Sequence, residues 1–261
     1  MSHVSKVYGN EDTPFSTEVA RGAIEGSRGF RAFGERRSAT AVTDGNDVYE
    51  GAPIEIAIPD QTTGVQVSVV STSVDDAIAG THVQKVHINY IDLAGDQQIE
   101  IFDMDGQTPV NSIATDIRFI NEFHSVQVDG SIVADGNITV YLSGSPLVVY
   151  SQISAGGNHA LNTAKMVPAG KRLYVSLFSA SATSGKPVSV RLRTTSDHEG
   201  IITPGLFYLY KDSVFLQNSN IVKNTLVPFF VPALAIIKIT AYSTQAGGQI
   251  SAGWEGWIED I

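Results

Sequence analysis

The strongest constraint on the fold is an alternation of apolar and other residues that begins after Pro53. Segments such as Val65–Val69, Val86–Tyr90 and Ile138–Leu142 place β-branched or aromatic residues at every second position. Successive side chains of a strand point to opposite faces, so a period of two is typical of strands with one buried face. The pattern continues in the second half, for instance in Leu173–Phe178. The chain is therefore predicted to consist mainly of half-buried strands.

The number and order of these segments indicate the fold class. There are about a dozen of them, and no helical segments of about 10–15 residues alternate with them. We therefore predict an all-β protein with an antiparallel, sandwich or jelly-roll-like body and an extended N-terminal arm. Leu93–Asp96 suits the turn of one hairpin and Ser179–Pro187 the tip of another. Thr108–Arg118 spaces its apolar residues at i, i+3, i+4 and i+7, which predicts a short helix.

Composition divides the chain into three regions. Residues 1–52 form the arm, residues 53–145 a first β region and residues 146–261 a second β region. The boundary between the β regions is placed at Ser143–Pro146, because turn-forming residues there separate two strand segments. The sequence leaves open whether the two β regions share one core.

The arm is rich in glycine and arginine and poor in apolar residues. Its arginines are Arg21, Arg28, Arg31, Arg36 and Arg37. Such a segment buries too little apolar surface to offset the entropy lost on ordering, so another surface must hold it. A neighbouring protein chain is the first expectation, and the chain's own body is the alternative. Because guanidinium groups pair well with carboxylates, we predict that these arginines bind a partner.

Charge and hydropathy exclude several classes of partner. The net charge is −10, which argues against general nucleic-acid binding, since that affinity comes largely from cations. The longest apolar run, residues 226–237, is too short to span a bilayer, and Met1–Val4 does not begin a signal peptide. The chain has no cysteine, which excludes disulfides and cysteine-ligated metals. We expect no nucleic-acid and no membrane partner.

The sequence contains no motif that predicts catalysis. A nucleophile elbow, a phosphate-binding loop and a dinucleotide-binding loop are all missing. His82 and His87 are the only two histidines close in sequence, and a spacing of five on a strand points them to opposite faces. The carboxylates of Asp103–Gly106 lack the further ligands of a calcium loop and suit a turn. We therefore predict no catalytic residues, no cofactor and no metal site.

Aromatic residues give the remaining signal for contacts. Trp254 and Trp257 are three residues apart, so on a strand they face opposite sides. We predict that one lies in the core and that the other, assigned as Trp257, covers an edge or a subunit contact. Leu206–Tyr210 carries apolar groups on both faces, which indicates a position between two sheets or at a subunit interface.

Several short segments are similar to parts of a known class of protein. They are His87–Tyr90, Asp105–Val110, Ala114–Ile117, Val167–Lys171, Val190–Arg193 and Gly253–Asp260. Together they resemble segments of virion structural proteins of tailed bacteriophages. The resemblance implies a non-enzymatic part of the particle: a head decoration (cement) protein, or an accessory of the neck or tail. Its partners would be the major capsid protein or other virion proteins, and no catalytic motif is carried over.

The residues themselves fit a protein whose role is contact. Residues 1–50 would lie across neighbouring subunits, and the β body would pack with its copies, most simply as a trimer about a three-fold axis. The lack of cysteine fits a virion protein that folds in the reducing host cytoplasm and is stabilised by assembly. A carbohydrate-binding module for host attachment is the alternative from another class, because jelly-roll scaffolds are common among such modules.

Overall fold

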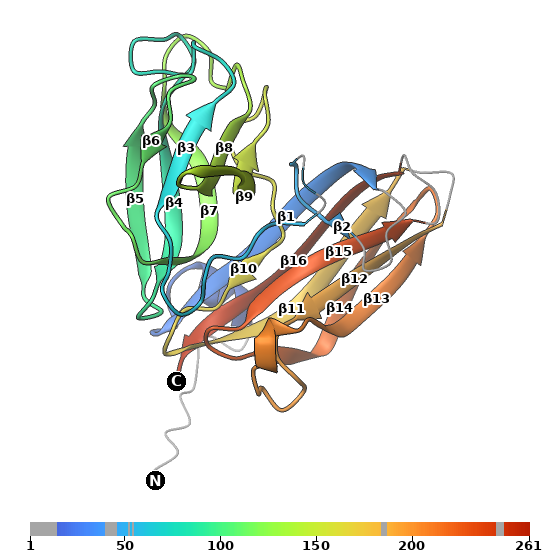
Figure 1. Cartoon of the computed structure of the whole chain (residues 1–261). Helices are drawn as coiled ribbons and strands as arrows, with labels where there is room; N and C mark the ends of the chain where they lie inside the picture. The colour runs from blue at the N-terminus through green and yellow to red at the C-terminus, as the bar shows by residue number, and fades with distance from the viewer. Residues whose placement is uncertain (1–14, 40–45, 52, 54, 184–186, 244–247) are drawn as a thin grey trace.

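The protein is almost entirely β and consists of two sandwiches (Figure 1). This computed structural model describes residues 15–39, 46–51, 53, 55–183, 187–243 and 248–261. Within these residues, sixteen strands form four antiparallel sheets. The predicted fold class is confirmed: an all-β protein with antiparallel sandwiches and an extended N-terminal segment.

The first sandwich is built from a continuous stretch of chain. Its strands are β3 (Val67–Ser71), β4 (Val83–Asp92), β5 (Gln97–Asp103), β6 (Val110–Asn111), β7 (Ile117–Val128), β8 (Ile138–Leu142) and β9 (Ser145–Ile153). One sheet has the order β6-β3-β8-β9 and the other the order β5-β4-β7. Apolar side chains such as Ile88, Phe123 and Ile138 fill the space between them. The alternation read from the sequence thus gives each strand one face toward this core.

The second sandwich combines both ends of the chain. Its strands are β1 (Ser27–Ala39), β2 (Asn46–Asp47), β10 (Lys165–Met166), β11 (Lys171–Ala182), β12 (Val188–Thr194), β13 (Leu209–Leu216), β14 (Ser219–Val231), β15 (Ile236–Ser243) and β16 (Gly248–Asp260). One sheet has the order β1-β16-β11-β14; the other has the order β10-β15-β12-β13, and β2 also pairs with β15. Two short helices, α1 (Phe15–Ala20) and the 3₁₀ turn η1 (Pro204–Leu206), complete the elements.

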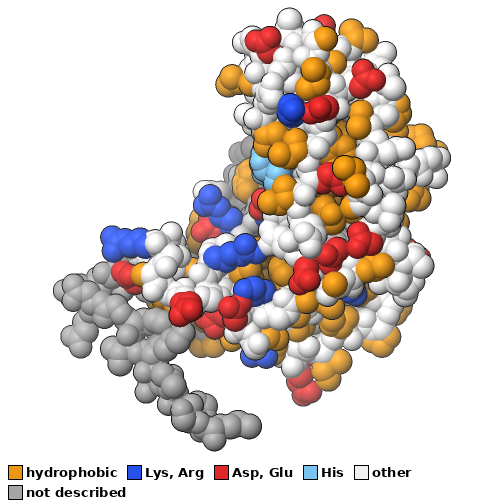
Figure 2. Space-filling view, turned by 90° about the vertical axis from the view of Figure 1, so that its left-hand side faces the viewer, with side chains coloured by type: hydrophobic (Ala, Val, Ile, Leu, Met, Phe, Trp, Pro, Cys, Tyr) orange, Lys and Arg blue, Asp and Glu red, His pale blue; other side chains and the backbone are white. Residues whose placement is uncertain are grey.

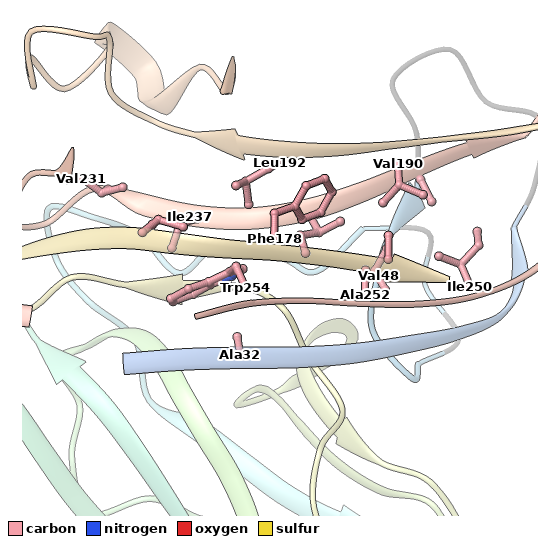
Figure 3. Packing of buried hydrophobic residues seen from close by; sticks show 14 of the residues in the cluster. Ala32, Val48, Phe178, Val190, Leu192, Val231, Ile237, Ile250, Ala252 and Trp254 are labelled. Carbon is pink, nitrogen blue, oxygen red and sulfur yellow. The ribbon is translucent and has the colours of Figure 1, made fainter. Parts of the chain in front are cut away.

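Trp254 lies at the centre of the second core. Its side chain is fully buried, close to Phe178 and Ile237 in Figure 3. The indole Nε1 donates a hydrogen bond to the Thr163 carbonyl at 2.9 Å, so the polar atom of this large side chain is satisfied. The prediction that one of the two tryptophans lies in the core is confirmed by this residue.

The described part of the arm is a strand of its own chain. β1 pairs with β16 in antiparallel register from Ser27↔Glu259 to Ala39↔Gly248. Phe30 and Ala32 are buried and give β1 an apolar inner face, although the segment as a whole has few apolar residues. Of the two surfaces expected to hold the arm, the chain's own body therefore holds residues 27–39. Residues 1–14, 40–45 and 52 of the arm lie outside the described residues.

The first sandwich is inserted between β2 and β10 of the second, and an apolar cluster joins the two. Tyr49, Ile56, Ile91, Phe119, Ala164, Met166 and Ile236 form this cluster. The β4–β5 turn also reaches the second sandwich, where the Gly95 carbonyl accepts a hydrogen bond from Ala169 N at 2.8 Å. Gly95 has φ 89°, and a Cβ there would lie 2.7 Å from Ala169 Cβ. This position therefore requires glycine.

The boundary between the sandwiches differs from the predicted one. Ser143–Pro146 contains the turn of the β8–β9 hairpin (Ser143 and Gly144) and the start of β9, inside the first sandwich, because Leu142 pairs with Ser145. The chain leaves the first sandwich only after Ile153. Turn-forming residues mark a hairpin as readily as a domain boundary, so this signal could not separate the two. The region predicted as 146–261 thus begins with a strand of the first sandwich.

Two local predictions are wrong. Thr108–Arg118 is not a helix: it contains β6 and the start of β7, and Ile113 is 91% exposed. The Glu100 carboxylate accepts the backbone N–H groups of Ile113 and Ala114, which fixes this segment as a loop. Ser179–Pro187 is not a hairpin tip, because β11 and β12 belong to opposite sheets. The polar connection crosses between sheets instead of reversing within one.

Candidate functional site

A cleft of about 810 Å³ lies between the two sandwiches. One wall comes from the first sandwich and from the residues between β9 and β10 (154–164), which we call the linking segment; this wall contains Glu122–Ser125 and Asn158–Leu161. The other wall is the outer face of the sheet of β1 and β16, with Arg31–Phe33 and Gly253–Glu255. In Figure 2 the histidines lie among hydrophobic side chains, and Lys, Arg, Asp and Glu side chains gather below them. The cleft therefore joins an apolar surface to a charged one.

Three imidazole rings follow one another beside the cleft, and two of them, His124 and His159, line its wall. His87 on β4 lies opposite His124 on β7, with ring centroids 4.5 Å apart. His124 is stacked on His159, which belongs to the linking segment, with centroids 5.7 Å apart. We call His87, His124 and His159 the histidine stack. Each ring comes from a different stretch of chain, and the sheet register brings them together.

Two imidazoles of the stack, His87 and His159, favour the neutral form. Burial lowers the pKa of His87, and a positive charge on His124 would lower it further. Burial also lowers the pKa of His159, with His124 again acting in the same direction. These groups can take up protons in the range where histidine normally titrates, but they do so less readily than isolated histidines.

An ion pair ties the two sandwiches together beside the stack. Lys165 Nζ on β10 lies 2.7 Å from Glu122 Oε1 on β7, and the Lys165 side chain is only 8% exposed. Burial by itself would raise the pKa of Glu122, but Lys165, together with the nearby His124 and His159, brings the pKa below its usual value. Burial lowers the pKa of Lys165, while Glu122 opposes this. The carboxylate is therefore ionised at neutral pH and held by its partner.

The functional groups at the cleft are imidazoles, which can bind protons, and one ion pair. In the part of the chain that the structure describes, no group of three or more His, Asp or Glu side chains is arranged to hold a metal ion. Among the same residues, no helix is long and apolar enough to cross a membrane.

The predicted arginines are spread over the molecule and do not form one site. Arg21, directly after α1, bonds to Glu18 of that helix, and Arg28 bonds to Gln97 across the junction. Arg31 is exposed and lines the cleft, where it lies opposite Glu255 on β16. Arg37 pairs with Glu50 at 2.5 Å and stays largely exposed.

Arg36 needs a correction. Its side chain faces inward, the residue is 7% exposed, and its Nη1 donates to the carbonyls of Asp47 and Pro53. The alternation of β1 that exposes Arg31 and Arg37 turns Arg36 toward the body. This arginine therefore serves the chain's own fold, and it is not available to a partner.

Trp257 lies on the outer face of the second sandwich. Its ring is stacked on Tyr174 with centroids 5.5 Å apart, and it meets Phe15 of α1 edge to face at 5.1 Å. The indole Nε1 donates to Glu259 Oε1 at 2.7 Å. Its role in partner binding stays a prediction.

An exposed apolar edge runs along the open side of the second sandwich. β13 and β14 are the edge strands of the two sheets, and the Lys223–Asp212 ion pair at 2.7 Å joins them. The most exposed large apolar side chains on or beside these strands are Phe207 (71%), Phe215 (78%), Val222 (62%) and Val227 (85%), and we call these four residues the apolar edge. Leu206–Tyr210 does not lie between two sheets, because it runs into the edge strand β13; the alternative position at a subunit interface stays a prediction.

The sequence reasoning missed the histidine stack. It compared only His82 with His87, and His82 in fact lies near Asp135, 3.8 Å away. The three stacked residues are far apart in sequence, and only the pairing of β4 with β7 and of His124 with His159 aligns them. The one local signal is that His87 and His124 each stand at the outward position of an alternating strand segment.

Comparison with known proteins gives little further guidance. No protein-family model matches the chain, and no curated protein matches its sequence. Among solved structures, infectious bursal disease virus (Gt strain) has a TM-score of 0.24 and 7% identity over 90% of this chain and 72% of the other. A mutant VP2 protein of the same virus, from derived T=1 particles, has a TM-score of 0.20 and 7% identity over 90% and 73%. Scores of this size establish neither a shared fold nor a shared function.

Proposed function

We propose that this chain is a non-enzymatic virion structural protein, and within that class a capsid decoration (cement) protein of a tailed bacteriophage. The observation that carries the proposal is the apolar edge. Large apolar side chains that stay exposed on and beside both edge strands of one sandwich favour a contact site there, because unpaired strand edges readily join another chain. The resemblance of segments such as Val167–Lys171 and Gly253–Asp260 to phage virion proteins gives the class of partner.

In this proposal the N-terminal segment takes part in the same contacts, but with fewer of its arginines than its composition suggests. Arg28, Arg31 and Arg37 remain exposed along β1, while Trp257 and Phe15 form an aromatic surface on the outer face of the same sheet. These groups are suited to carboxylates and apolar side chains of the major capsid protein or of a second copy. A homo-trimer about a three-fold axis is the simplest arrangement, with assembly taking place in the host cytoplasm.

The direct test is incorporation into particles. Phe215→Ser and Val227→Ser change exposed side chains of the apolar edge, so folding should be preserved. We expect these variants to be lost from purified virions. Ile113→Ser and Leu147→Ser are matched controls, since they change equally exposed apolar residues of the first sandwich. Equal incorporation of all four variants would contradict the proposal.

Copy number in the particle separates the decoration role from its alternatives. A number comparable to that of the shell protein supports decoration, whereas a single ring of copies would place the protein in the neck or tail. The carbohydrate-binding alternative receives less support from the cleft. Two of its amides are already used internally, since Asn121 bonds to Met166 and Asn162 bonds to the Ala164 amide. Binding to a glycan array would restore that alternative.

A further inference from the structure

The histidine stack is not needed for a static contact surface, yet it lies where the chain passes from one sandwich to the other. We propose that the stack is an acid-sensitive latch, which fastens residues 158–160 to β7 at neutral pH and releases them on acidification. The inference stands apart from the proposed virion role, because it depends only on the geometry of the junction.

The latch has a small number of contacts. Ser125 N donates to the Asn158 carbonyl at 2.8 Å, and Ala160 N donates to the Phe123 carbonyl at 2.8 Å. Ring stacking between His124 and His159 lies between these two hydrogen bonds. His159 is exposed to water on its outer side, so protons can reach the stack without unfolding. A few residues further on, the chain enters β10 of the second sandwich. The latch thus controls how closely the linking segment follows the first sandwich.

Protonation works against the stack. Neutral imidazoles can pack closely, as His124 and His159 do face to face, but two charged rings 4.5 to 5.7 Å apart lie well inside the Debye length of about 8–10 Å and repel each other. In the latched state the pKa values of His87 and His159 lie below the ordinary value of 6.5. The released state therefore binds protons more strongly. The latch is at full strength above about pH 6.5 and weakens as the pH falls below that value.

The charged groups around the histidine stack also favour release of the latch at low pH. Those that line the cleft are Glu122 on β7, Lys165 on β10, Arg31 on β1 and Glu255 on β16. On its other side, His87 faces Ile101 of β5, which is apolar, and the nearby Lys85 is paired with Asp103 at 2.9 Å. Glu122 attracts protons to the imidazoles, but Lys165 already binds its carboxylate. Charged imidazoles would compete for Glu122 and loosen the tie between the sandwiches as well.

Amide hydrogen exchange by NMR tests the latch directly. The amides of Ala160 and Ser125 report it, and those of Val69 and Val140, in the opposite sheet, are internal controls. After correction for intrinsic exchange rates, the protection of Ala160 and Ser125 should fall at least about tenfold between about pH 7.5 and pH 5. Protection of Val69 and Val140 should not change. A pH-independent protection of Ala160 would overturn the proposal.

Two variants separate the latch from a general effect of acid. His124→Phe keeps a ring in the middle of the stack but removes the charge that repels His87 and His159, so Ala160 should lose less protection at about pH 5 than in the unmodified protein. His198→Phe changes an exposed histidine outside the stack and should behave as the unmodified protein. Equal loss of protection in both variants would contradict the proposal. If His124→Phe does not fold, NMR titration of the unmodified protein decides: His87 and His159 must titrate below 6.5.

Discussion

The two sandwiches are similar in architecture but differ in how the chain builds them. The first is continuous, and neighbouring strands such as β4 and β5, or β8 and β9, are joined by short turns. The second is closed by residues from opposite ends of the chain, since Ser27 pairs with Glu259. β1 and β16 can pair only after the whole intervening chain has been placed. Strand pairs of the first sandwich can therefore form between segments that are close in sequence, whereas the β1–β16 pair of the second sandwich cannot.

The largest expected effect comes from removing β1. Deletion of residues 1–39 exposes the backbone edge of β16 and opens the core at Phe30 and Ala32. We expect the second sandwich to unfold while the first stays folded. Both tryptophans of the chain, Trp254 and Trp257, lie in the second sandwich, so their fluorescence reports it alone.

The readout for that deletion is the comparison of two signals. Tryptophan emission should shift to that of exposed indole, while NMR signals of His87 and His124 should stay dispersed. A deletion variant with unchanged tryptophan emission would show that the second sandwich closes without β1, and the contrast between the sandwiches would fail.

A smaller effect is expected at the centre of the second core. Trp254→Ala leaves a cavity and an unpaired Thr163 carbonyl, and large aromatic-to-alanine changes in cores cost about 3–5 kcal/mol. Urea unfolding followed by circular dichroism measures this loss. Trp257→Ala, on the outer face, is the matched control and should cost less than about 2 kcal/mol. Similar losses in the two variants would contradict the assignment of inner and outer faces.

Two neighbouring arginines of β1 provide a finer comparison. Arg36→Met removes the hydrogen bonds that the buried guanidinium donates to the carbonyls of Asp47 and Pro53, which lowers the free energy of unfolding by about 1.5–3 kcal/mol. Arg37→Met removes an ion pair to Glu50 whose arginine is largely exposed, and such pairs contribute about 0–1 kcal/mol. Thermal unfolding of both variants checks the order, and a larger loss for Arg37→Met would refute it.

The smallest effect concerns a turn of the first sandwich. The side-chain and backbone hydrogen bonds from Thr62, together with those from Thr63, lower the pKa of Asp60 to about 2. Its stabilising contribution is complete above the ordinary pKa of 3.8 and is lost as the pH falls toward 2. NMR titration of the Asp60 carboxyl should show this midpoint, and Thr62→Ala should raise it. A midpoint near 3.8 in the unmodified protein would rule out the turn geometry.

Local features of the fold were predictable, and distant pairings were not. The alternation in Val86–Tyr90 and the turn at Leu93–Asp96 gave β4, β5 and their hairpin correctly, because hairpins depend on neighbouring residues. The apolar spacing in Thr108–Arg118 was misleading, since Glu100 from β5 binds its backbone and no helix forms. Nothing local identifies β16 as the partner of β1.

The candidate site was likewise not predictable from local sequence, because it depends on distant pairings. The cleft and the histidine stack depend on the register of β4 with β7 and on the return of the linking segment past His124. Single residues were easier to place than sites. The tryptophans were correctly expected on opposite faces, because three residues on a strand fix that relation. Arg36 was misassigned because arginine is rarely buried, and only its hydrogen bonds in the fold account for it.

The central structural claim is that the N-terminal segment completes the sandwich of its own chain. Arg31 and Glu255 are neighbours across β1 and β16 on the outer face, and the chain has no cysteine of its own. Residues in this relation have Cα atoms about 4.5–5.5 Å apart, a spacing that a disulfide can bridge. Oxidation of the double variant Arg31→Cys, Glu255→Cys, followed by mass spectrometry, is therefore the most direct test. A disulfide within one chain is the predicted result, and a disulfide between two chains would contradict it.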